Sequence, residues 1–299
     1  MSVTTTAATA TAARRAEALG ATLPPLLVAA KRVAATVASG VHGRRRVGQG
    51  DAFWEYRPLR PGESARRADP RASAKAARPF VRETEWEAAQ TVLLWRDASP
   101  SMRWRSGSAL PTKGERAELL LLALAALLLR GGERVALLDG APRPRAGRAA
   151  LEGLADQLGT AHGRNAAVDE DGMPRPGPLP RHARAVLLGD FLGPLDRVRE
   201  RLAGMAGVGV GGHVLQVLDP AEAALPYAGR VRFRGLEGET DHLVASVEGV
   251  RDAYAAALAA QQRGLAALCA AAGWSFTVHR TDHPPEAALL GLHAALTRA

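Results

Sequence analysis

Short apolar runs alternate with longer amphipathic stretches from residue 91 to the end of the chain. The apolar runs are typical of strands buried on both faces of a sheet, and they cover 91–96, 134–139, 184–190, 213–218 and 274–278. The stretches between them have apolar residues at helical spacing, over 113–130, 149–158, 195–206, 248–272 and 285–297. Strands that alternate with helices predict an α/β fold with a doubly wound, mostly parallel sheet.

The first 90 residues lack this regularity. Apolar positions at 26–37 follow helical spacing, whereas 40–62 are rich in glycine and arginine around an aromatic cluster. We expect an extended loop or short strands in 40–62, and another short strand at 81–86. The chain is therefore divided into a flexible N-terminus (1–24), an N-terminal helical and irregular extension (25–88) and an α/β domain (89–299).

Composition allows a sizeable core without disulfides, because 47% of the residues are hydrophobic and Cys269 is the only cysteine. Cys269 lies in an alanine-rich helical pattern and is expected to be a small buried core residue. The most apolar run, 119–129, is too short to cross a bilayer. With no signal-peptide pattern at the N-terminus, the sequence predicts no membrane span and a cytoplasmic protein.

The chain is basic, with 39 Lys and Arg residues against 30 Asp and Glu residues and a net charge of +9. This balance raises the hypothesis of nucleic-acid binding. However, the basic residues are dispersed and aromatic residues make up only 4% of the chain. A dispersed basic surface attracts polyanions weakly without reading their sequence, so specific nucleic-acid binding is an alternative and not the favoured function.

Two acidic residues stand at the ends of predicted strands: Asp97 follows 91–96, and Asp190 closes 184–190. Asp97 also begins an Asp-x-Ser-x-Ser pattern with Ser99 and Ser101. Ligands of open α/β sheets bind outside the carboxyl ends of the strands, and carboxylate and hydroxyl oxygens suit Mg²⁺, Mn²⁺ or Ca²⁺. The sequence therefore predicts a metal site of Asp97, Ser99, Ser101 and Asp190. The alternative is that Asp97 and Ser99 only shape a turn or cap helix 113–130.

The run Asp97-Ala-Ser-Pro-Ser-Met102, followed by a long apolar helix, resembles the metal-ion-dependent adhesion site of von Willebrand factor A domains. Further segments resemble the bacterial family called domain of unknown function 58; they are Gly50–Arg57, Pro61–Glu63, Asp69–Arg71, Val81–Glu83, Leu187–Phe191, Val217–Glu222 and Gly235–Glu239. The chain departs from the family at Pro70, where a tryptophan is usual, and 140–148 lack the threonine of adhesion-type sites.

The resemblance implies a von Willebrand factor A-like, Rossmann-like fold, no catalytic activity and a MoxR-type AAA+ ATPase as partner. The favoured function is therefore a metal-dependent protein-interaction module, an accessory in complex assembly or chaperone-like work, which takes a carboxylate from its partner at the metal. One alternative is a metal-assisted phosphoester hydrolase that uses Asp97, although the chain lacks a glycine-rich phosphate loop with lysine. The other alternative is the basic nucleic-acid-binding protein.

Overall fold

The computed structural model describes residues 45–48, 52–60, 63–64, 68–74, 79–87, 89–138, 142–163, 172–175, 177–236, 238 and 240–297. The predicted flexible N-terminus (1–24) and the predicted helix at 26–37 lie outside these ranges. The described residues fall into two compact units, a smaller one within 42–90 and a larger one from residue 91 onward. Each unit is described by itself.

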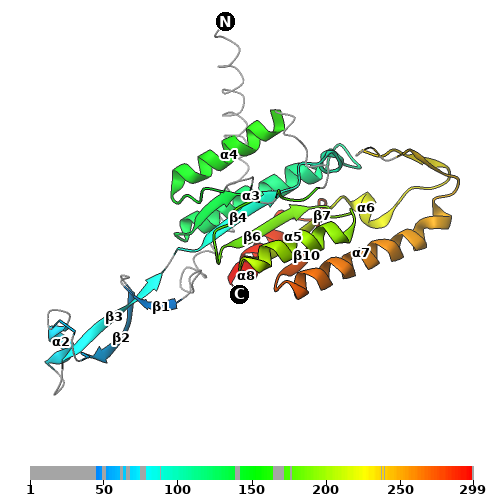
Figure 1. Ribbon diagram of the computed structural model, residues 1–299. Helices are drawn as coiled ribbons and strands as arrows, with labels where there is room; N and C mark the ends of the chain where they lie inside the picture. The colour runs from blue at the N-terminus through cyan, green and yellow to red at the C-terminus, as the bar shows by residue number, and fades with distance from the viewer. Residues whose placement is uncertain are drawn as a thin grey trace, which may run out of the picture. The chain divides into compact units, whose positions relative to one another are not determined.

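The N-terminal unit is built on a small antiparallel sheet. Its strands are β1 (Arg45–Gly48), β2 (Ala52–Pro58) and β3 (Phe80–Glu87), in the order β1-β3-β2 (Figure 1). The helix α2 (Pro70–Ser73) begins where the Asp69 carboxylate accepts hydrogen bonds from two backbone N–H groups. The short strands expected in this part of the chain are therefore present.

The larger unit contains a parallel five-stranded sheet. Its order is β10-β7-β6-β4-β5, formed by β4 (Thr91–Arg96), β5 (Arg134–Leu137), β6 (Arg184–Gly189), β7 (Gly211–Leu218) and β10 (Ser275–Arg280). The chain runs from β4 to β5 on one side and then crosses to β6 on the other. The carboxyl ends of β4 and β6 therefore flank a topological switch point, where α/β proteins bind ligands.

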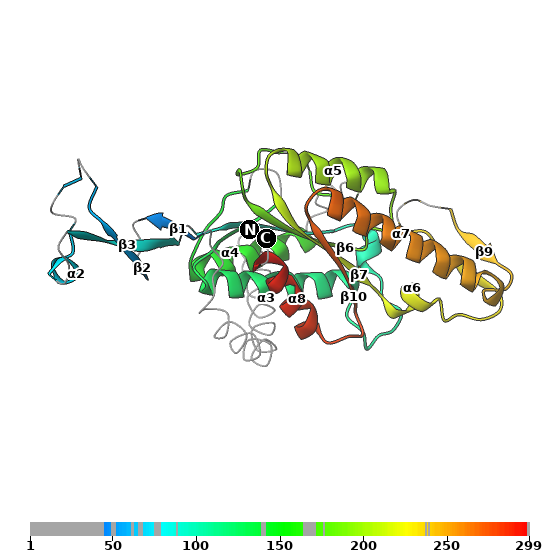
Figure 2. The ribbon, with the colours of Figure 1, turned by 90° about the horizontal axis from the view of Figure 1, so that it is seen from below.

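Helices cover both faces of this sheet, as Figure 2 shows. One face packs against α3 (Lys113–Arg130), α4 (Arg148–Gly163) and α8 (Pro285–Thr297). The other face packs against α5 (Leu195–Gly207) and α7 (Arg251–Ala271). Successive strand residues alternate between the two cores, which is why the strands have continuous apolar runs. The prediction of an α/β fold with a mostly parallel sheet is confirmed.

Several element boundaries differ from those expected. Helix α4 continues to Gly163, past the expected end at residue 158, and a 3-10 turn (Glu248–Val250) precedes α7. A short helix, α6 (Pro220–Ala224), also follows β7. The short apolar runs at 231–233 and 243–245, which suggest a pair of strands in the sequence, lie in an antiparallel hairpin of β8 (Val231–Phe233) and β9 (His242–Val244). The helix α6 has only five residues and no apolar periodicity of its own. Cys269 is fully buried in the core, as predicted.

Candidate functional site

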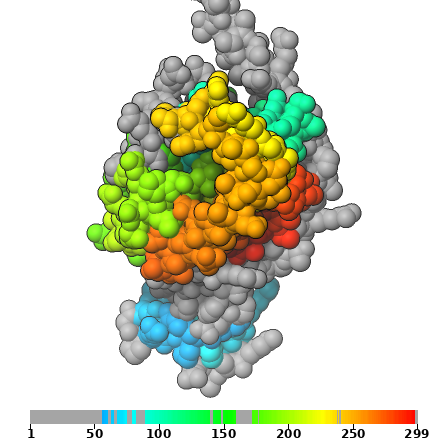
Figure 3. Space-filling model, turned by 90° about the vertical axis from the view of Figure 1, so that its right-hand side faces the viewer, coloured from blue at the N-terminus to red at the C-terminus, as the bar shows by residue number. Residues whose placement is uncertain are grey.

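The carboxyl ends of β4 and β6 bring Asp97 and Asp190 to the same edge of the sheet. The backbone N–H of Asp97 donates to the carbonyl of Leu188 at 2.7 Å, which extends the pairing of the strands past Arg96. Both carboxylates are buried, with 3% of Asp97 and 6% of Asp190 exposed. Viewed from this side, the surface is hollowed between α5 and the region of α7 and the β8–β9 hairpin (Figure 3).

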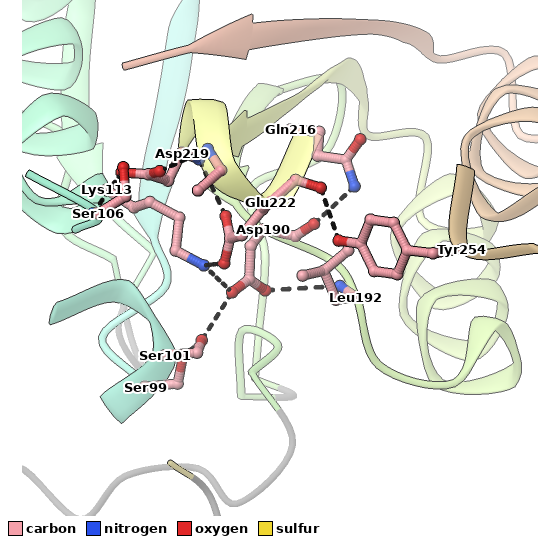
Figure 4. A network of polar contacts seen from close by, with 11 residues as sticks. Ser99, Ser101, Ser106, Lys113, Asp190, Leu192, Gln216, Asp219, Glu222 and Tyr254 are labelled. Atoms are coloured by element: carbon pink, nitrogen blue, oxygen red, sulfur yellow. Dashed lines mark hydrogen bonds and ion pairs between the residues drawn. The ribbon is translucent and has the colours of Figure 1, made fainter. Parts of the chain in front are cut away.

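The loop after β4 gathers the oxygens of the Asp-x-Ser-x-Ser pattern. Asp97 Oδ1 accepts the backbone N–H of Ser99 at 2.7 Å, and the Oγ atoms of Ser99 and Ser101 lie 3.0 Å apart. Ser101 Oγ then donates to Asp190 Oδ2 at 2.7 Å (Figure 4). The four residues predicted as metal ligands therefore form one connected polar cluster.

Two glycines allow the backbone to approach Asp97 closely. A Cβ atom at Gly189 would lie 3.1 Å from Asp97 Cβ, and one at Gly172 would lie 3.3 Å from Asp97 Oδ2. Gly172 also has a φ of +55°, which disfavours other residues. Asp97 is thus enclosed by main chain on two sides.

The alternative that Asp97 or Ser99 caps α3 is wrong. Thr112 is the N-cap residue of α3, and its side chain accepts the backbone N–H of Glu115. The Glu115 carboxylate in turn accepts the backbone N–H of Thr112, which completes a capping box. The Asp97 loop is therefore not needed to start this helix.

Lys113, the first residue of α3, places an ammonium group in the cluster. Its side chain is 1% exposed, and Nζ lies 2.8 Å from Asp190 Oδ2 and 2.5 Å from Glu222 Oε1. Burial acts to lower the pKa of Lys113, but Asp190 and Glu222 together raise it above its ordinary value. Lys113 is therefore charged at neutral pH.

The helix α6 positions Glu222. Asp219 caps α6, with Oδ1 accepting the N–H of Ala221 at 2.8 Å and Oδ2 accepting the N–H of Ser106 at 2.9 Å. Glu222 Oε2 accepts the N–H of Asp219 at 2.9 Å, which leaves Oε1 for Lys113. Burial raises the pKa of Glu222, while the charge and hydrogen bond of Lys113 act in the opposite direction.

Glutamines from β7 and α7 hold the segment after Asp190. Gln216 Nε2 donates to the carbonyl of Asp190 at 2.7 Å, and Gln262 Nε2 donates to Gln216 Oε1 at 3.1 Å. Gln261 Nε2 donates to the carbonyl of Phe191 at 3.0 Å. Phe191 has a φ of +47°, which is unfavourable for a residue with a bulky side chain. These hydrogen bonds keep a strained turn, and with it Asp190, in place.

The donor chemistry of the predicted ligands fits a hard divalent cation, because Asp97, Ser99, Ser101 and Asp190 offer carboxylate and hydroxyl oxygens. Across the described ranges, no group of three or more His, Cys, Asp or Glu side chains is gathered as a metal site. The serine hydroxyls and solvent would therefore have to complete the coordination. Asp190 Oδ2, moreover, already accepts hydrogen bonds from Ser101 and Lys113. The Mg²⁺ site stays a prediction.

Lys113 and Glu222 were missed in the sequence as parts of the site. A signal was present in the composition: the chain has 3 lysines and 36 arginines. In such a chain a lysine at the first position of an apolar helix is unusual and invites attention. The Asp-Pro-Ala-Glu run at 219–222 is also a capping-box signature.

Fold and site together define a parallel α/β protein with a buried charged cluster at the carboxyl edge of its sheet. The sequence matches the family described as Protein of unknown function DUF58 over residues 55–264, so the chain belongs to this family. The expected membership is thereby confirmed.

Its relatives include Uncharacterized protein Mb1516 of Mycobacterium bovis and Uncharacterized protein Rv1480 of Mycobacterium tuberculosis. Each is 29% identical over 276 residues, which cover 88% of this chain and 85% of the relative. Like the family, these relatives have names that assign no activity.

Similar solved structures include the conserved hypothetical protein BatB from Bacteroides thetaiotaomicron, with 12% identity and a TM-score of 0.37. An aerotolerance-related membrane protein from Bacteroides fragilis has 15% identity and the same TM-score. Each similarity covers 71% of this chain and 100% of the solved chain.

One of these neighbours is named as a membrane protein, and a further solved structure, from Vibrio fischeri with a TM-score of 0.19, is named as a membrane spanning protein. These names, which describe those proteins, do not agree with the prediction of a cytoplasmic protein. We withdraw that prediction. Within the described ranges, no helix combines the length and the apolar character that a membrane span requires.

Proposed function

We propose that the protein is a protein-binding module with a von Willebrand factor A-like fold, whose docking site is the carboxyl edge at the Asp97 loop. The observation that carries this proposal is the convergence of charged side chains, three of them buried and Glu222 partly buried, from four separate segments. Asp97, Lys113, Asp190 and Glu222 come from the β4 loop, α3, the β6 end and α6. Such a cluster is costly to bury, so a role beyond packing is favoured.

Charge supports a cation as part of the docking site. The acidic side chains Asp97, Asp190, Asp219 and Glu222 outnumber Lys113 in this cluster. A bound divalent cation would offset part of this excess. We propose Mg²⁺ held by Asp97, Ser99, Ser101 and Asp190, with a carboxylate of the partner as a further ligand. The partner we propose is a MoxR-type AAA+ ATPase, on the strength of the family resemblance.

One feature argues for binding and against turnover. A hydrolase needs a group that accepts a proton from its nucleophile, but the raised pKa of Lys113 keeps this side chain protonated. Without the ion, the excess of carboxylates at this edge repels phosphates, which disfavours direct nucleic-acid binding there.

The test is affinity purification of the tagged full-length chain in Mg²⁺ and in excess chelator, with an Asp97→Asn variant beside it. The asparagine side chain of this variant keeps an oxygen that accepts the N–H of Ser99, so the loop is expected to fold while its charge is lost. Asp196→Asn, which changes an exposed carboxylate in the first turn of α5, is the matched control.

The proposal predicts that an AAA+ ATPase is recovered with wild type and with Asp196→Asn, only when Mg²⁺ is present. Asp97→Asn should lose the capture while its unfolding transition stays close to that of wild type. Equal recovery of the ATPase by Asp97→Asn and wild type would show that the Asp97 loop is not the docking site.

A further inference from the structure

The positively charged ammonium group of Lys113 lies between two carboxylates. Asp190, at the end of β6, lies on one side at 2.8 Å, and Glu222, in α6, lies on the other at 2.5 Å (Figure 4). Both hydrogen bonds are charge-assisted, the stronger kind in proteins. Only 1% of the Lys113 side chain is exposed, so water screens these two interactions weakly.

The choice of lysine is informative in a chain that has 36 arginines and 3 lysines. A guanidinium group is a broad planar fork, whereas an ammonium group is a compact point charge that donates in several directions. The space between Asp190 Oδ2 and Glu222 Oε1 is thus filled by a group that resembles a small bound cation. In shape and charge, Lys113 stands in for an ion.

A divalent cation and Lys113 would contend for the same carboxylate, that of Asp190. Asp190 Oδ2 accepts the hydroxyl of Ser101 at 2.7 Å and the ammonium of Lys113 at 2.8 Å. An ion held by Ser101 and Asp190 would therefore bring a second positive centre next to Lys113. Two such charges repel strongly in a buried site, where solvent screens them poorly. Glu222 Oε1 offers Lys113 an acceptor that does not depend on Asp190.

We infer that Lys113 is a built-in competitor of the metal ion. It neutralises Asp190 when no divalent ion is bound, and it is retained by Glu222 alone when one binds. This inference rests on the proposed Mg²⁺ site and adds its regulation. The competition keeps the affinity for Mg²⁺ low in the free protein. A carboxylate of the partner adds a ligand to the ion, so the partner and Mg²⁺ bind cooperatively.

The test is calorimetric titration of Mg²⁺ into the full-length chain without any partner. Three proteins are compared: wild type, Lys113→Met, and Arg103→Met as a control. Arg103 is exposed at the end of the 3-10 turn Pro100–Arg103, so its replacement removes a positive charge near the site without touching Asp190. Lys113→Gln, which keeps a hydrogen-bond donor, is titrated as well, so that the test survives if Lys113→Met does not fold.

We expect Lys113→Met and Lys113→Gln to bind Mg²⁺ more tightly than wild type by at least about tenfold, because a repelling charge is gone. Arg103→Met should stay within about twofold of wild type, because solvent screens exposed charges. Equal affinities for wild type and the Lys113 variants would overturn the competition and leave the proposed metal site intact. Absence of Mg²⁺ binding by all the proteins at millimolar concentration would overturn both.

Discussion

Lys113 and Arg116 lie one turn apart at the start of α3 and are both buried, yet their surroundings differ in charge. Lys113 faces the carboxylates of Asp190 and Glu222, and its pKa is raised. Burial lowers the pKa of Arg116, whose carboxylate neighbours Glu286 and Asp282 only partly oppose it. Lys113 therefore lies in a site rich in charge, whereas Arg116 lies among largely neutral groups.

The hydrogen bonds of Arg116 tie α3 to the connection between β10 and α8. Its guanidinium donates to the carbonyl of His283 at 2.6 Å and to that of Thr281 at 2.9 Å, and it lies 3.0 Å from His279 Nε2. Burial and Arg116 lower the pKa of His279 to about 4, so its ring is neutral and accepts this hydrogen bond. Arg116 is therefore a structural clamp, whereas Lys113 belongs to a site with an excess of negative charge.

The largest effect is expected from Arg116→Met. The substitution leaves the buried carbonyl of Thr281 and the partly buried carbonyl of His283 without this donor, and such losses are costly in a protein interior. We expect the free energy of unfolding to fall by about 4 kcal/mol, measured by urea denaturation. Saturating Mg²⁺ should not restore it. Recovery in Mg²⁺ would mean that Arg116 is coupled to the charged site.

Lys113→Met should destabilise the protein by about 3 kcal/mol, because it leaves the buried carboxylate of Asp190 and the partly buried one of Glu222 without this counter-charge. Here millimolar Mg²⁺ should recover most of the loss, since a ligand that binds only the folded state stabilises it. The measurement is urea denaturation with Mg²⁺ and with chelator. If Mg²⁺ does not restore the lost stability of Lys113→Met, Lys113 and Arg116 do not differ in their coupling to the metal site.

Acid should weaken the Arg116 clamp through His279. Its folded pKa of about 4 lies below the ordinary value of 6.5, so the unfolded chain takes up a proton first as the pH falls below 6.5. Its contribution to stability is therefore lost between about pH 6.5 and pH 4, by about 2 kcal/mol at pH 5. His279→Gln should lose less stability than wild type between pH 7 and pH 5. Equal losses, measured by urea denaturation at both pH values, would contradict this assignment.

A smaller effect is expected from Gln261→Ala, which acts on the turn that holds Asp190. Gln261 donates to the carbonyls of Phe191 and Gly193 at 3.0 Å and 2.8 Å. Their loss should cost about 1 kcal/mol of stability. Because Phe191 is strained, a looser turn should also weaken Mg²⁺ binding, by about twofold to threefold. An unchanged Mg²⁺ affinity in calorimetry would show that Gln261 supports the fold alone.

Much of the larger unit was predictable from its apolar pattern. Helices 113–130 and 285–297 have the expected bounds, because long periodic stretches specify a helix well. Asp97 and Asp190 were expected at one edge, because parallel strands end on the same side of a sheet. These two predictions needed only the apolar periodicity along the chain and the rule that parallel strands end at one edge of the sheet.

The charged partners of Asp190 were not predictable in this way. Lys113 is separated by 77 residues from Asp190 and by 109 residues from Glu222, and α6 is too short to show a periodicity. A lysine at the start of a helix is usually solvated, so only the packed structure reveals its burial. The Arg116 clamp was missed for the same reason, because its partners are mainly backbone carbonyls of a distant loop.

The competition between Lys113 and a divalent ion is tested most directly by NMR of lysine side-chain nitrogens in the wild-type chain. Only three signals are expected, and the Lys113 signal is assigned from its loss in Lys113→Arg. We predict a hydrogen-bonded Lys113 ammonium whose protons exchange slowly without Mg²⁺, and whose signal shifts as Mg²⁺ saturates the site. A Lys113 signal that exchanges like that of a free lysine, or that does not change at saturating Mg²⁺, would contradict the competition.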